Sequence, residues 1–174
     1  LIDTADLKKQ MTQLPQVKAV KVHRKLPSTL VFDITERTPW AKTVVNADMI
    51  IIDREGKILN VTGVQVITTD ELIDLKGITT IKDLEPFTRK FKYSLEKIRN
   101  IFPDQQIEVT AIGPYEINIR INKQLLIIWG TEDNVDEKTK IVKAILPVIQ
   151  GQWARIGYID TRSPKNLAIR YLSR

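Results

Sequence analysis

Few side chains in this 174-residue sequence have the types and spacing that enzyme chemistry requires. The single histidine, His23, has no cysteine and no second histidine with which to build a transition-metal site. A serine nucleophile would need a nearby base, and no Gly-x-Ser-x-Gly pattern occurs. The 21 carboxylates could contain a pair suited to glycoside cleavage, because pairing in space is invisible in sequence. We therefore predict no enzymatic activity, metal or cofactor, with a carbohydrate-active or peptidoglycan-binding enzyme as the alternative that the carboxylates leave open.

The glycines and the charges also argue against nucleotide and nucleic-acid binding. No phosphate-binding glycine motif is present, and the seven glycines are mostly isolated at turns. The net charge of +6 would suit a polyanion, but basic residues alternate with acidic ones through most of the chain. We predict neither a nucleic-acid partner nor a small-molecule substrate.

Local patterns near the amino terminus predict a short helix followed by a β-hairpin. Leu7, Met11 and Leu14 have helical spacing after Asp3 or Thr4, either of which could cap the helix. Two alternating runs then follow, separated by a turn at Leu26–Thr29. The apolar residues of these runs are Val20, Val22, Leu30, Phe32 and Ile34.

The rest of the chain predicts an antiparallel sheet covered by two helices. We place a domain junction at Lys42–Asp48 and a hairpin at Met49–Leu59, with Asp53–Gly56 as its turn. Val61–Lys82 is predicted to be loop with short extended pieces. The remaining elements are a helix from Leu84 to Phe102, three strands within Gln106–Ile128, a helix from Asn134 or Asp136 to Gly151, and a closing hairpin of Ile156–Thr161 and Leu167–Tyr171.

Both ends of the chain resemble the FtsQ/DivIB family of cell-division proteins. At the amino end, the resemblance to the second half of their POTRA domain rests on the residues Leu14, Pro15, Val17, Ala19, Val20, Val22, Arg24, Pro27, Thr29, Leu30, Glu36, Arg37, Pro39 and Ala41. At the carboxyl end, Tyr158–Arg162 and Asn166–Tyr171 are similar to the family's two final strands. The middle of the chain matches mainly in the order of its elements.

The resemblance implies an α+β fold in two domains. Residues 1–43 would be the carboxyl-terminal part of a POTRA domain, with the first strand and helix missing, and residues 44–174 the family's β domain. Because the chain begins with Leu1 inside the expected POTRA helix, we expect a fragment of a longer protein.

The resemblance also implies a role, partners and a location. We expect a non-catalytic divisome scaffold that acts in septum formation and contacts FtsB/FtsL-like and FtsW/FtsI-like proteins. The native protein would be anchored in the inner (plasma) membrane by one amino-terminal transmembrane helix absent from this sequence, with this domain in the periplasm or extracytoplasmic space. A POTRA-containing component of an outer-membrane or envelope protein transport system is the alternative.

We expect the partner to bind by β-strand addition at the last strand, because a strand that ends a sheet has unpaired peptide groups. From Gly151 to Arg174, five basic residues face one acidic residue, which favours an acidic partner. Arg162 could instead pair internally with Asp160, and the two tyrosines could be ordinary core or edge residues. The predicted partner-binding residues are Tyr158, Arg162, Ser163, Leu167, Ile169, Arg170 and Tyr171. Ser163–Asn166 departs from the family pattern, which has an aromatic residue after the arginine and a small Ser-Gly turn.

Overall fold

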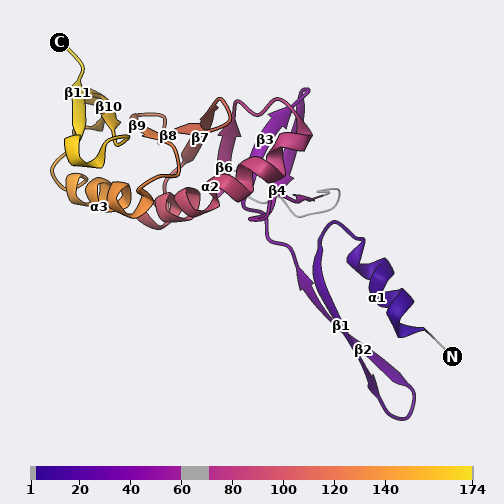
Figure 1. Cartoon of the computed structure of the whole chain (residues 1–174). Coiled ribbons are helices and arrows are strands. Elements are labelled where there is room, and N and C mark those ends of the chain that lie inside the picture. Colours follow the sequence, from indigo (N-terminus) through magenta and orange to yellow (C-terminus); the bar gives the residue numbers. More distant parts are fainter. Residues whose placement is uncertain (1–2, 60–70, 174) are drawn as a thin grey trace.

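The computed structural model describes residues 3–59 and 71–173, and its elements form two groups (Figure 1). The first group consists of helix α1 (Thr4–Thr12) and the antiparallel strands β1 (Val17–Lys25) and β2 (Thr29–Glu36). The Asp3 side chain caps α1 by accepting a hydrogen bond from the Ala5 amide at 2.8 Å. The predicted helix and hairpin are therefore confirmed.

The second group is built on one sheet of nine strands in the described part of the chain. The strands are β3 (Ala41–Val45), β4 (Asp48–Ile52), β5 (Ile58–Leu59), β6 (Ile73–Lys76), β7 (Ile107–Ile112), β8 (Glu116–Ile121), β9 (Leu125–Gly130), β10 (Ile156–Asp160) and β11 (Ala168–Tyr171). Their order across the sheet is β11-β10-β9-β8-β7-β6-β3-β4-β5. The pairs β9–β10, β3–β6 and β6–β7 are parallel, and the other five pairs are antiparallel.

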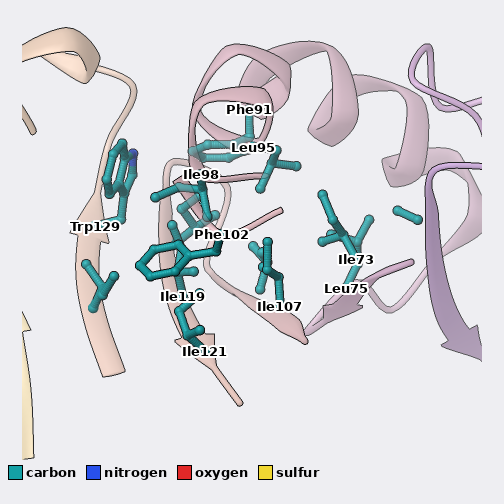
Figure 2. Packing of buried hydrophobic residues seen from close by; sticks show 14 of the residues in the cluster. Ile73, Leu75, Phe91, Leu95, Ile98, Phe102, Ile107, Ile119, Ile121 and Trp129 are labelled. Atoms are coloured by element: carbon teal, nitrogen blue, oxygen red, sulfur yellow. The ribbon is translucent and has the colours of Figure 1, made fainter. Parts of the chain in front are cut away.

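Helices α2 (Ile81–Ile101) and α3 (Val135–Ile145) lie on the same side of this sheet (Figure 1). Phe91, Leu95 and Ile98 of α2 are fully buried and point toward the sheet, where Ile107 and Ile119 meet them (Figure 2). The alternation of buried isoleucines with half-exposed residues along β8 fits one covered face and one open face. The predicted α+β fold, with a mostly antiparallel sheet and two covering helices, is confirmed. Of the helices in the described ranges, none combines the length and hydrophobicity needed to cross a bilayer.

Three predicted segments need correction. Lys42–Asp48, predicted to be a junction, contains most of β3 and its turn into β4, so the predicted boundary between residues 43 and 44 falls inside a strand. The β3–β4 hairpin was not predicted because its turn residues with positive φ are Asn46 and Ala47, and no glycine marks the turn. The chain connecting the two groups is residues 37–40. The division into two domains stays a prediction.

The other two corrections concern the loop and the second helix. Much of the loop predicted at Val61–Lys82 lies outside the described residues, but Ile73–Lys76 forms β6, an interior strand, and α2 begins at Ile81. Helix α3 ends at Ile145 and does not continue to Gly151, because Pro147 has no amide hydrogen with which to extend the helix. Ile149 is still buried, in the turns that follow.

Candidate functional site

The hairpin of β10 and β11 forms one edge of the sheet, with β11 outermost (Figure 1). β10 runs parallel to β9, with Ile159 opposite Ile127, and antiparallel to β11, with Tyr158 opposite Arg170. The Thr161 amide continues the parallel pairing by donating to the Ile128 carbonyl at 3.0 Å. The closing hairpin and the edge position of its last strand are as predicted from the sequence.

The peptide groups of β11 divide into an inner and an outer set. The Leu172 amide donates to the Arg155 carbonyl at 2.8 Å, so it points toward β10. The Arg170 carbonyl also faces β10, since it would lie 3.4 Å from a Cβ at Gly157. Peptide groups alternate in direction along a strand. The amides and carbonyls of Ile169 and Tyr171 consequently point away from the sheet, where an added strand would bind.

The side chains of β11 present two different surfaces. Ile169 lies opposite Ile159 and, with Leu167, packs against the core on the helix side of the sheet. Arg170 projects from the open side and is exposed. Tyr171 is 54% exposed, and Leu172 beside it is also exposed. An aromatic and an aliphatic side chain therefore flank the outward peptide groups of the edge.

Arg162 does not extend freely from the turn, because it binds Asp160. Its Nη2 lies 2.6 Å from Asp160 Oδ2, and its Nε donates to Oδ1 at 3.0 Å. The hydrogen bond from this guanidinium is the main cause that lowers the pKa of Asp160. The internal ion pair that the sequence allowed, Asp160 with Arg162, is thus present. The Arg162 side chain is nevertheless 55% exposed, so the edge of its guanidinium that faces away from Asp160 is accessible to solvent.

The remaining predicted residues occupy different positions around this edge. Tyr158 is half-buried on β10, one strand inside the edge, and Ser163 is exposed in the turn before a 3-10 helix at Pro164–Asn166. Sequence reasoning missed Gly130, the last residue of β9, against which Arg162 packs. Its only signal was a glycine at a strand end.

The electrostatic character of the hairpin is basic. Asp160 is neutralised by Arg162. Within the described ranges, Arg155, Lys165 and Arg170 form no ion pair with any carboxylate. Three cations are therefore available to an acidic partner.

Side chains suited to metal chemistry are not gathered in the described part of the chain. No group of three or more His, Cys, Asp or Glu residues there is arranged to hold a metal ion. His23 lies in the exposed β1–β2 hairpin, where its Nε2 is 2.8 Å from Asp33 Oδ2.

Comparison with known proteins agrees with the architecture. Residues 1–37 match the family model described as POTRA domain, FtsQ-type. A protein from Corynebacterium glutamicum named Cell division protein FtsQ is 26% identical over 177 residues, covering 97% of this chain and 72% of the relative. Along nearly its whole length the chain is therefore similar to FtsQ proteins, and its first 37 residues match their POTRA domain.

Two other FtsQ proteins show how far the likeness extends. One from Novosphingobium aromaticivorans is 38% identical over 88 residues, which are 51% of this chain and 27% of the relative. One from Cellvibrio japonicus is 22% identical over 174 residues, which are 98% of this chain and 51% of the relative. The chain thus spans between about a quarter and three quarters of the length of these FtsQ relatives.

Proposed function

We propose that this chain is the extracytoplasmic part of a non-catalytic cell-division scaffold that binds a partner by β-strand addition along β11. The observation that carries this proposal is the position of β11 at the end of the sheet order, with the peptide groups of Ile169 and Tyr171 directed outward. The names of the FtsQ relatives support the cell-division role.

The energetics require side chains as well as the backbone. Two outward residues offer two amides and two carbonyls, and each such hydrogen bond contributes only about 0.5 to 1.5 kcal/mol net. Association costs roughly 4 to 15 kcal/mol of lost freedom. Anchor side chains must supply the difference. Tyr171, exposed at the edge, is of a residue type that is enriched at interface hot spots, and exposed Leu172 beside it adds apolar surface.

The charges favour an extended partner segment that carries acidic residues. Arg170 lies on β11, and the exposed Arg155 and Lys165 lie in the short helices before β10 and before β11. The Arg162 guanidinium binds Asp160 through Nε and Nη2, which leaves its Nη1 free of Asp160. The extracytoplasmic end of an FtsB-like or FtsL-like protein is the partner class that we propose, with FtsW/FtsI-like proteins further along the same assembly. In this scheme one transmembrane helix, encoded upstream of this chain, anchors the protein in the inner membrane at the septum.

The test is co-purification of the full-length protein with its FtsB-like partner from the same genome. Tyr171→Glu introduces a charge at the edge that should repel an acidic strand, so we expect at least tenfold weaker binding, about 1.4 kcal/mol. Tyr115→Glu is the matched control, because Tyr115 is 63% exposed but lies in the turn between β7 and β8, away from β11. Equal binding by both variants would refute strand addition at this edge.

A second measurement separates edge binding from loss of folding. The two variants should unfold at closely similar temperatures, since both tyrosines are exposed. In cells that depend on the full-length gene, Tyr171→Glu should cause filamentation, whereas cells that carry Tyr115→Glu should divide normally.

A further inference from the structure

The short connection between the hairpin group and the sheet contains a residue that belongs to both. The Arg37 amide donates to the Gln16 carbonyl at 2.7 Å, so its backbone is part of the hairpin group. Trp40 is already part of the sheet, because its amide donates to the Ile52 carbonyl at 2.9 Å. Only Thr38 and Pro39 lie between these two attachments.

The Arg37 side chain reaches across this connection to the turn between β4 and β5. Its Nη1 lies 2.5 Å from Asp53 Oδ2 and 2.8 Å from Glu55 Oε2. The side chain of Arg37 is 17% exposed and that of Asp53 only 6%, so the pair is largely shielded from solvent. Lys18 of β1 adds a second, exposed contact, with its Nζ 2.6 Å from Glu55 Oε1.

The turn that receives Arg37 is itself held firmly. Asp53 Oδ1 accepts hydrogen bonds from the Glu55 amide at 2.8 Å and the Lys57 amide at 2.9 Å. Gly56 has φ +79°, and a Cβ there would lie 2.7 Å from the Glu85 Cα of α2. The turn is therefore packed against α2, and its backbone amides hold the Asp53 carboxylate in place.

We propose that Arg37 is a latch that fixes the direction of the β1–β2 hairpin relative to the nine-stranded sheet. Pro39 restricts its own φ and disfavours helical conformations at Thr38, so few backbone rotations remain between the two groups. The ion pair between Arg37 and Asp53 then stabilises one set of backbone angles in this connection, and with it one orientation of the hairpin. Lys18 and Glu55 reinforce it weakly, because exposed ion pairs contribute little.

The proposal predicts a loss of fixed orientation when the latch is removed. The sequence has no cysteine, so Lys21→Cys on β1 and Lys143→Cys on α3 give two spin-labelling sites, both at exposed positions. Electron–electron double resonance then measures the distance distribution between the hairpin and the helix. We expect one narrow distribution in the parent and a distribution about twofold wider or more in Arg37→Met, because linked units move freely unless an interface holds them.

Two further variants make the experiment decisive. Arg54→Met is the matched control, since Arg54 lies exposed in the same turn, and it should leave the distribution unchanged. Glu55→Gln removes the exposed carboxylate of the latch and keeps Asp53, so intermediate broadening is expected even if Arg37→Met folds poorly. Parent-like distributions in both Arg37→Met and Glu55→Gln would overturn the proposal.

Discussion

Gly130 and Arg162 lie in direct contact, so that a Cβ at Gly130 would be 2.7 Å from the Arg162 Cγ. Gly130 ends β9 with φ +77°, and Arg162 follows β10, the strand beside β9. The aliphatic part of the Arg162 side chain thus packs against the backbone of Gly130, while its guanidinium binds Asp160.

Gly130→Ala should destabilise the protein through both the backbone and the contact. An alanine at positive φ costs about 1 kcal/mol or more, and the clash with Arg162 adds to that, giving roughly 2 to 3 kcal/mol in total. Gly113→Ala is the control, because Gly113 also has positive φ, +65°, but a Cβ there would meet nothing within 4 Å. Urea unfolding measures both, and an equal loss in the two variants would show that the Arg162 contact has no effect.

The Asp160–Arg162 pair should make part of the stability depend on pH. The arginine lowers the pKa of Asp160 in the folded state below its ordinary value. The contribution of the pair to the free energy of unfolding is therefore complete above the ordinary aspartate pKa. This contribution is lost as the pH falls through the lowered pKa of Asp160 in the folded state. Asp160→Asn should be less stable than the parent at pH 7, and the difference should shrink in the acidic range below about pH 4.

Unfolding curves at pH 7 and at pH 3 test this dependence. Asp104→Asn, at an exposed position in the turn before β7, serves as the control for a general loss of negative charge. A difference between Asp160→Asn and the parent that stays constant over this pH range would contradict the assignment.

Two hydroxyls on the buried side of α2 should respond to removal in opposite ways. The Ser94 Oγ accepts a hydrogen bond from the Trp129 indole at 2.8 Å, and both side chains are fully buried. Ser94→Ala would leave the indole N–H unpaired and should cost about 1 to 3 kcal/mol. Thr88 Oγ1 is buried without a hydrogen-bond partner among the described residues, so Thr88→Val should be neutral or stabilising.

Thermal and denaturant unfolding of these two variants distinguish the hydrogen bond from hydroxyl burial as such. The double variant Trp129→Phe with Ser94→Ala should lose less free energy of unfolding than the sum of the losses in the two single variants. The reason is that the double variant removes donor and acceptor together and leaves neither one unpaired. Similar destabilisation by Ser94→Ala and Thr88→Val would indicate that helix packing, and no specific bond, determines the result.

The sequence by itself determined the local elements and the likeness to FtsQ proteins. Alternation predicted the β1–β2 hairpin, the β7–β9 meander and the closing β10–β11 hairpin, because a period of two and a nearby turn are local properties. The spacing of Phe87, Phe91, Leu95 and Ile98 predicted α2 for the same reason. Glycine and proline marked most of the other turns. The β3–β4 turn was missed because its two positive-φ residues are Asn46 and Ala47, and neither is a glycine or a proline.

The tertiary structure alone decided which distant residues meet. β10 pairs in parallel with β9, and β6 lies between β3 and β7, since parallel partners are joined through intervening helices or long connections and depend on global packing. The same folding brings Arg37 to Asp53 and sets Arg162 against Gly130. Residue types along the chain predicted a basic segment from Gly151 to Arg174 that includes the closing hairpin. Only the three-dimensional arrangement shows that one of its arginines is already bound, because ion pairs form between neighbours in space.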